Sequence, residues 1–246
     1  MHRTDLYRNV HMGQRARLFA LAVDLGNADI TRSGVAAHLA ARCLAMTHEL
    51  RAHADHEDTF IHQLLRERAP EAADALDAEH VRLDVAFAAL DEQARELPTA
   101  DAEALPESQH ALYLAWNEAI SAYLAHLHVE ETVAMPALWR HADDQELDAV
   151  FTAFHASLTP EETLDDLRKM LPAVPPAVRT AIVRDVLNAG PEEQAGSTLA
   201  AICTTLSPDQ HARLYEELDV PEAWAVRAAM GQGDAAAQSS SRAASS

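Results

Sequence analysis

Two histidine–glutamate pairs of identical spacing are the residues of this chain best suited to chemistry. The pairs are His53-x-x-x-Glu57 and His126-x-x-x-Glu130. Because a helix advances about 100° per residue, the two members of each pair lie on the same face of a helix. Leucine, methionine and aromatic residues recur on that face in both segments. Both pairs are therefore expected to point into an apolar core.

Two further histidines share the apolar face of a predicted helix. His11 lies in one stripe with Tyr7, and His80 lies in one stripe with Leu83 and Phe87. A single core histidine is more often an ordinary polar residue than a ligand, and a single His-x-x-x-Glu pair is more often an exposed ion pair. It is the repetition on four successive apolar faces that favours a chemical role.

The same helical phase places four polar residues on the side that faces away from the pairs. They are His48, His62, His128 and Glu131. We expect these four side chains to face solvent. Val133 is instead predicted to lie inward, on the same face as His126.

Burial of two carboxylates without partners would cost several kcal/mol each, so a core that contains them needs compensating cations. Imidazole and carboxylate ligands together suit iron, manganese or zinc. Two carboxylates can also bridge two ions, and helix bundles are known hosts for such pairs. The four histidines and two glutamates therefore predict a metal site between helices.

Four long amphipathic segments must position these residues. Glycine is scarce, at 7 residues, and alanine is abundant, which favours an all-α fold. The connections are short, so neighbouring helices should run antiparallel in an up-down four-helix bundle. Thr4 is a predicted N-cap, and Pro136 is expected to kink or end the last helix. The predicted segments span about residues 4–25, 33–68, 70–97 and 106–141.

The remainder of the chain is predicted to form a separate helical layer. We expect the bundle in residues 1–145, shorter helices in 146–230 and a disordered, low-complexity tail in 231–246. Thr159 and Ser207, each followed by proline, are predicted N-caps. The layer has no His-x-x-x-Glu pair, so it is not expected to bind metal. Its apolar residues are expected to cover the bundle, shape access to it or form a homodimer surface.

The formal net charge of −20 argues against nucleic acid and against anionic membrane surfaces as partners. No apolar run reaches the roughly 18 residues of a spanning helix. The first residues have no apolar stretch like that of a signal peptide. Cys43 and Cys203 are far apart and belong to no Cys-x-x-Cys pair, so a reducing cytoplasm is the expected location.

The order His, His-x-x-x-Glu, His, His-x-x-x-Glu resembles the hemerythrin-like, or HHE-type, cation-binding domain. The similarity covers roughly residues 5 to 140 and includes the Glu-Glu that precedes an apolar-Pro-x-Leu stretch around Pro136. It implies an up-down bundle with a non-haem centre of two iron ions, in which manganese or zinc is an alternative. The implied ligands are His11, His53, Glu57, His80, His126 and Glu130, with both glutamates bridging.

One departure from the hemerythrin pattern concerns the third helix. Oxygen-carrying hemerythrins have a His-x-x-x-His pair there, whereas His80 is followed four residues on by Asp84. Asp84 is either a ligand or a solvated, salt-bridged acid. One histidine fewer leaves a position where dioxygen or peroxide could react. Tyr7 and Arg15 flank His11 and either hydrogen-bond near the centre or serve as core packing and an ion pair.

The resemblance is compatible with three functions. The first is a di-iron module that binds dioxygen, nitric oxide or iron for sensing or storage. The second is a di-iron oxidase or peroxidase-like enzyme with a small substrate. In the third, the metal only stabilises a bundle with a structural role. We expect iron and oxygen binding, and leave catalysis open.

Overall fold

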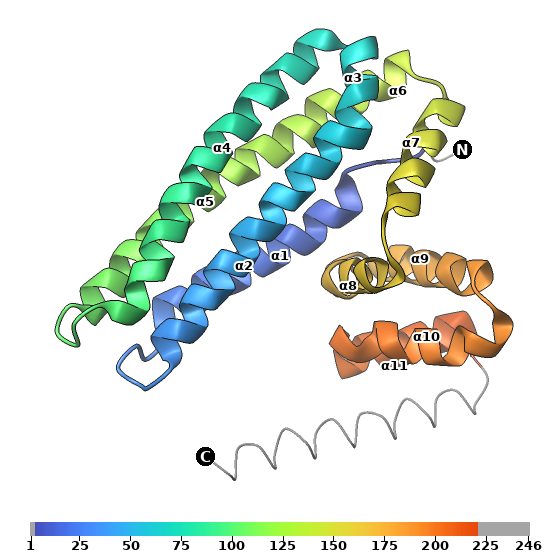
Figure 1. The fold of residues 1–246 in the computed structure, drawn as a ribbon. Coiled ribbons are helices and arrows are strands. Elements are labelled where there is room, and N and C mark those ends of the chain that lie inside the picture. The colour runs from blue at the N-terminus through green and yellow to red at the C-terminus, as the bar shows by residue number, and fades with distance from the viewer. Residues whose placement is uncertain (1–2, 221–246) are drawn as a thin grey trace. The chain divides into compact units, whose positions relative to one another are not determined.

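The computed structural model describes residues 3–220, and every regular element in that range is a helix (Figure 1). The predicted all-α class is thereby confirmed for the described part of the chain. The predicted disordered tail, residues 231–246, lies outside the described residues, as do the last residues of the predicted C-terminal layer. The chain divides into an N-terminal unit that ends at Ser157 and a C-terminal unit that begins at Leu158.

Long helices packed side by side make up the N-terminal unit (Figure 1). Its elements are α1 (Arg8–Asn27), α2 (Val35–His56), the π turn η1 (Glu57–Ile61), α3 (His62–Arg68), α4 (Pro70–Glu96), the 3-10 turn η2 (Leu97–Thr99), α5 (Leu105–Val129), the π turn η3 (Glu130–Ala134), α6 (Met135–His141) and α7 (Asp144–Ser157). Helix α1 packs against α2 and α5, and α4 also packs against α2 and α5. Helix α3 contacts α4 and α6.

Two apolar clusters form the core of this unit, with polar residues between them. One cluster contains Leu18, Leu50 and Leu83, and the other contains Tyr7 and Leu76. Along the chain, His11, His53 and His80 each fall between a residue of one cluster and a residue of the other. The unit therefore has a polar layer at one level, enclosed by apolar side chains on both sides.

Each π turn adds one residue to a helical turn, which rotates everything after it by about 100° relative to an uninterrupted α-helix. The burial pattern shows this shift. Leu65 is fully buried while Leu64 is half-buried, and Ala134 is fully buried while Val133 is 47% exposed. The prediction that Val133 points inward is therefore wrong, because it assumed an unbroken α-helix.

Two further predictions concern the N-cap of the first helix and the effect of Pro136. Thr4 does not cap the first helix. Instead, the Asp5 carboxylate accepts hydrogen bonds of 3.1 Å from the backbone N–H groups of Tyr7 and Arg8. Pro136, which was expected to kink or end the last long helix, lies in the first turn of α6, directly after the π turn η3, where a missing N–H costs little.

Helix α7 belongs to the N-terminal unit through its side chains. Leu147 is fully buried in the same cluster as Tyr7, and the Phe154 ring contacts the rings of His56 and Phe60. The N-terminal segment also holds this helix, since the Thr4 hydroxyl donates a 2.5 Å hydrogen bond to Asp148. The bundle predicted from the sequence ends at residue 145, before most of this helix.

The C-terminal unit has an apolar core of its own. Its elements are α8 (Pro160–Met170), α9 (Pro176–Ala189), the 3-10 turn η4 (Glu192–Gln194), α10 (Ala195–Ile202), the 3-10 turn η5 (Cys203–Thr205) and α11 (Pro208–Leu218). Leu171, Val183 and Leu199 are fully buried. The N-caps predicted at Thr159 and Ser207 are confirmed, and both belong to complete capping boxes.

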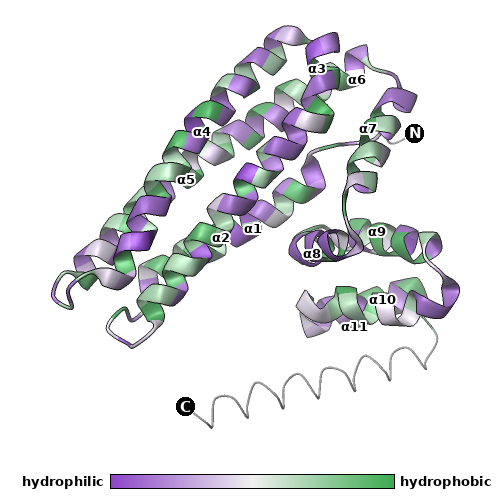
Figure 2. Cartoon of the chain, in the orientation of Figure 1, coloured by the Kyte–Doolittle hydropathy of each residue, from purple (hydrophilic) through white to green (hydrophobic). Residues whose placement is uncertain are grey.

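Apolar and polar residues alternate along most of the helices (Figure 2). Within residues 3–220, none of the helices combines the length and the apolar character that crossing a bilayer requires.

Candidate metal centre

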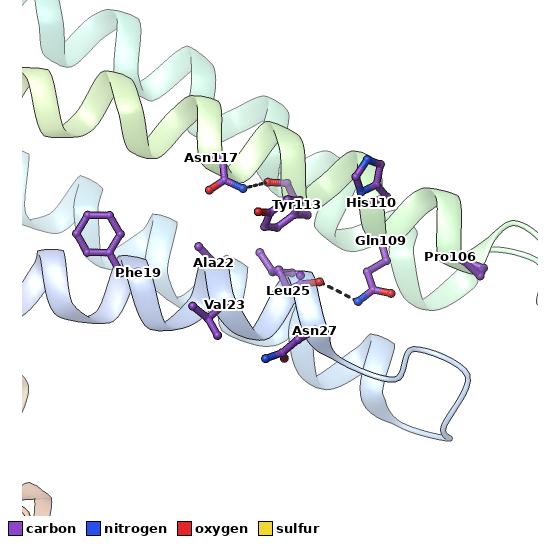
Figure 3. Close-up of a pocket in the computed structure, with 11 residues that line it drawn as sticks. Phe19, Ala22, Val23, Leu25, Asn27, Pro106, Gln109, His110, Tyr113 and Asn117 are labelled. Atoms are coloured by element: carbon purple, nitrogen blue, oxygen red, sulfur yellow. Dashed lines mark hydrogen bonds between the residues drawn. The ribbon is translucent and has the colours of Figure 1, made fainter.

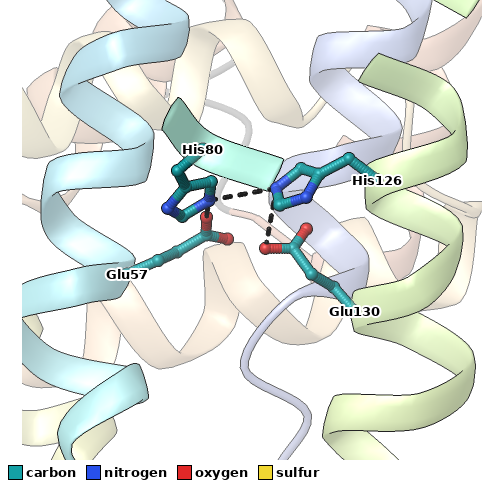
Figure 4. Close-up of side chains that lie close together, drawn as sticks. All are labelled: Glu57, His80, His126 and Glu130. Atoms are coloured by element: carbon teal, nitrogen blue, oxygen red, sulfur yellow. Dashed lines mark hydrogen bonds and ion pairs between the residues drawn. The ribbon is translucent and has the colours of Figure 1, made fainter. Parts of the chain in front are cut away.

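The structure brings all six predicted ligands together in the polar layer of the N-terminal unit, and Figure 4 shows four of them. Helices α1, α2, α4 and α5 supply the histidines, and the glutamates are the first residues of the two π turns. Glu57 and Glu130 are 2% and 0% exposed, and even the most exposed ligand side chain, His53, is only 13% exposed. The six residues are His11, His53, Glu57, His80, His126 and Glu130.

The two carboxylate oxygens of each glutamate face different histidines. Glu57 Oε1 lies 2.9 Å from His53 Nε2 and 3.5 Å from His11 Nε2, whereas Glu57 Oε2 lies 3.6 Å from His80 Nε2. Glu130 Oε2 lies 3.4 Å from His11 Nε2, whereas its Oε1 lies 3.2 Å from His126 Nε2. Each glutamate therefore spans the space between two groups of imidazoles.

These distances fit ligand atoms that share a cation. Two donors that are each about 2.1 Å from one ion lie about 3.0–3.4 Å apart in octahedral or tetrahedral geometry. Both oxygens of Glu57 and Glu130, and the Nε2 atoms of His11 and His53, are buried without a hydrogen-bond partner. Such orphaned groups cost free energy unless a cation compensates them. The described residues thus contain histidine and glutamate groups that could hold a metal ion.

Charge in the metal-free site is balanced by protons on the histidines. Burial lowers the pKa of His11, but contacts with Glu131 and Glu57 outweigh this effect and raise that pKa to about 9. Burial likewise opposes protonation of His80, yet its carboxylate partners Asp58 and Glu57 raise the pKa to about 10. Burial would raise the pKa of Glu57, but the surrounding histidines hold it well below its ordinary value.

Carboxylates contact the outer nitrogen of three of the four histidines. Their role is to fix the orientation of each ring, so that Nε2 points toward the centre. The contacts are His11 Nδ1 to Glu131 at 2.9 Å, His80 Nδ1 to Asp58 at 3.2 Å and His126 Nδ1 to Glu79 at 3.0 Å.

Both π turns begin with a similar local sequence. Glu57-Asp58-Thr59 opens one turn and Glu130-Glu131-Thr132 opens the other. In both, the threonine hydroxyl donates to the carbonyl four residues earlier, at 2.7 Å from Thr59 and 2.6 Å from Thr132. The acid after each ligand glutamate is turned toward a neighbouring helix, where it meets a histidine Nδ1. This repeated Glu-acid-Thr pattern was the signal that helical phase alone missed.

Two of the predicted outward residues are not outward. His62 is fully buried, with Nδ1 2.8 Å from Asp58, and Glu131 is 29% exposed and contacts His11. Both predictions are wrong for the same reason, because both residues come after the start of a π turn and are rotated inward. His48 and His128 precede these turns and are exposed, as predicted.

The structure shows the surroundings of the three residues for which the sequence left two roles open. Asp84 is 65% exposed and pairs with Arg51 at 2.6 Å. Of its two predicted roles, its surroundings are those of a solvated, salt-bridged acid. Arg15 pairs with Glu131 at 2.6 Å. Tyr7 is fully buried with no hydrogen bond to its hydroxyl, and burial, then the charges of Glu130 and Glu57, raise its pKa well above the ordinary value.

Two surface grooves of the N-terminal unit lie apart from these ligands. The larger, of about 700 Å³, runs between α1 and α5 (Figure 3) and is lined by residues such as Phe19, Val23 and Tyr113. Gly26 borders it, and an added Cβ there would lie 3.0 Å from the Tyr113 ring, so the ring would have to shift to admit a side chain. The second groove borders Arg68 and His141. Neither groove includes any of the six ligand residues.

The fold and the site together define an all-helical protein with buried histidine–glutamate clusters of metal-binding type. No family model, no curated protein and no solved structure matches this chain.

Proposed function

We propose that the N-terminal unit is a hemerythrin-like up-down four-helix bundle that binds two iron ions and, at them, dioxygen or a related ligand such as peroxide or nitric oxide. One observation carries this proposal. Each of the two buried glutamates turns one oxygen toward His11 or the His11–His53 pair, and the other oxygen toward His80 or His126.

This division produces two sets of donors. One set consists of His11, His53 and one oxygen of Glu57, and one oxygen of Glu130 faces this set at His11. The other consists of His80, His126 and the remaining oxygens of the same glutamates. Two ions bridged by both carboxylates satisfy every orphaned donor among these ligands, whereas a single ion would leave one set without a partner.

Iron is proposed among the candidate metals for the redox chemistry that it would supply. Mixed imidazole and carboxylate ligands suit iron, manganese and zinc, and four protein donors leave an octahedral ion with positions for an outside ligand. Iron bound there would supply the redox chemistry that dioxygen, peroxide and nitric oxide require. The apolar clusters on both sides of the layer exclude bulk water from that position.

Binding is proposed in preference to catalysis on a larger substrate. A di-iron oxidase or peroxidase-like enzyme would need a substrate cavity beside the ligands, and the two grooves described above do not border them. A carrier, sensor or store needs only room for a small ligand at the ions.

The test is metal analysis of protein loaded anaerobically with Fe²⁺ and desalted, with absorption spectra taken before and after addition of dioxygen or nitric oxide. We expect two irons per chain and a spectral change with either gas. His53→Ala should lose most of the iron. The matched control is His48→Ala, since His48 is an exposed residue of the same helix. Equal iron contents in these two variants, or less than one iron per chain in the unaltered protein, would refute the proposal.

A further inference from the structure

The two halves of the polar layer differ around the acids that come directly after the ligand glutamates. Asp58 and Glu131 occupy equivalent positions in the repeated turns. Glu131 pairs with the guanidinium of Arg15 at 2.6 Å. Asp58 lies 2.8 Å from His62 and 3.2 Å from His80, and among the described residues it pairs with no arginine or lysine. The half of the layer at Glu131 thus has an arginine beside the acid, whereas the half at Asp58 has two imidazoles beside it.

His62 is the second point of difference. It is the first residue of α3, five residues after Glu57, and the equivalent first residue of α6 is Met135. Both side chains are buried, at 0% and 1% exposure. A buried methionine therefore suffices for packing at this position, and an imidazole is not required. The imidazole of His62 leaves its Nε2 buried without a hydrogen-bond partner, which is a cost to stability.

A chain of ligand-type groups leads from this histidine to solvent. Asp58 and Asp77 have 41% and 39% of their side chains exposed, and Asp77 Oδ1 lies 3.7 Å from His62 Nδ1. Both carboxylate oxygens of Asp77 also accept hydrogen bonds from the Arg66 guanidinium, at 3.0 to 3.4 Å. Asp58, His62 and His80 bring ligand atoms close enough to hold one ion.

His80 connects this chain with the buried centre. Its Nδ1 faces Asp58 at 3.2 Å, and its Nε2 faces Glu57 at 3.6 Å and His126 Nε2 at 3.1 Å. Its ring stacks on that of His62, with centroids 5.3 Å apart. The six proposed ligands are almost fully enclosed, so an ion must pass some partly exposed group to reach them.

We infer that Asp58, His62 and Asp77 form an outer site for a divalent transition-metal cation, which takes ions from solvent and passes them by way of His80 to the buried centre. The inference rests on the proposed function of the bundle. Carboxylates and imidazole are suitable ligands for such ions. A neutral imidazole ligates through one nitrogen at a time, so His80 serves the outer site only until it binds an ion at the centre.

The test is the rate at which the metal-free protein takes up Co²⁺, followed by its visible absorption in a stopped-flow instrument, together with the amount bound at the end. Asp77→Asn removes an exposed carboxylate, and His62→Met installs the residue of the equivalent position. Asp74→Asn is the matched control, because Asp74 is an exposed acid one turn away on α4. Circular dichroism verifies that each variant is folded.

We expect Asp77→Asn to fill about tenfold more slowly, since charges that line an approach change association rates by about this factor or more. His62→Met should also fill more slowly, because it removes the imidazole ligand of the outer site. Both should still bind two ions, and Asp74→Asn should fill at the unaltered rate. Filling at the control rate in both variants would overturn the outer site. A lower final amount would also overturn it, because the residues would then belong to the centre. If the unaltered protein takes up no Co²⁺, the proposed function itself fails.

Discussion

Glu57 and Glu130 are the first residues of the two π turns in the N-terminal unit, and both are buried in the same polar layer. The acids directly after them, Asp58 and Glu131, extend to histidines on neighbouring helices. A single local feature, repeated once, therefore supplies both the proposed bridging ligands and two of the carboxylates that orient the imidazoles. π turns of this kind are frequent at functional sites.

Replacement of Glu131 by glutamine should weaken iron binding by about 10- to 100-fold, because the carboxylate that orients His11 is lost. Equilibrium competition with a chelator measures this affinity. Glu118→Gln is the matched control, since Glu118 is an exposed acid on α5, and it should bind iron normally. Indistinguishable affinities of the two variants would show that Glu131 does not act on the centre.

The register after the first π turn can be tested through stability. Leu65 is fully buried, so Leu65→Ala should lower the free energy of unfolding by about 2–5 kcal/mol. Leu64 is only half-buried, and Leu64→Ala should cost distinctly less. Urea denaturation followed by circular dichroism gives both values. The reverse order would mean that the helix continues as an ordinary α-helix beyond Glu57.

The stability of the metal-free protein should fall as the pH rises from 7 to 10. His11 and His80 have pKa values of about 9 and 10 in the folded state, above the unfolded value of about 6.5. Their protonation therefore contributes stability in full below the unfolded pKa, and this contribution is lost as the pH passes 9 to 10. Bound ions should take over the role of these protons.

Melting temperatures of metal-free and metal-loaded protein, measured across this pH range, test that expectation. The difference between the two forms should widen with pH. Since the rest of the chain is common to both forms, its titration cancels in the comparison. Parallel curves would mean that protons and metal ions do not compete for these histidines.

One buried cysteine in each unit allows the units to be monitored separately. Burial raises the pKa of the Cys43 and Cys203 thiols to about 12, so neither should react with a thiol reagent while its unit is folded. Metal binding should slow the labelling of Cys43 and leave that of Cys203 unchanged, because all the proposed ligands are in the N-terminal unit. Peptide mass spectrometry distinguishes the two sites. Equal protection of both thiols would contradict this assignment.

The boundary between the units predicts where the chain can be shortened. A protein that ends at Ser157 should remain folded and bind two irons. One that ends at residue 145 lacks Leu147 and Phe154, and should be less stable, because Leu147 is fully buried in the core around Tyr7. Thermal melts and iron content of the two proteins provide the comparison. Loss of iron in the longer of them would show that the C-terminal unit contributes to the site.

Most of the fold, and all six proposed ligands, could be inferred from the amino-acid sequence. His53 and His126 precede the π turns, and each ligand glutamate is the first residue of one, so helical phase counted along an ideal α-helix places them correctly. The N-caps at Thr159 and Ser207 were predictable for a similar reason, since a capping box involves only neighbouring residues.

Only the tertiary structure decided which way the residues after each ligand glutamate point. A π turn is unfavourable in an isolated helix and persists where packing and hydrogen bonds with other helices compensate for it, so it cannot be counted from local periodicity. One extra residue rotated His62 inward, brought Glu131 to His11 and turned Val133 to the surface. The amino-acid sequence by itself indicated the six proposed ligands of the buried centre. The contacts between helices determined which of the remaining polar residues surround them.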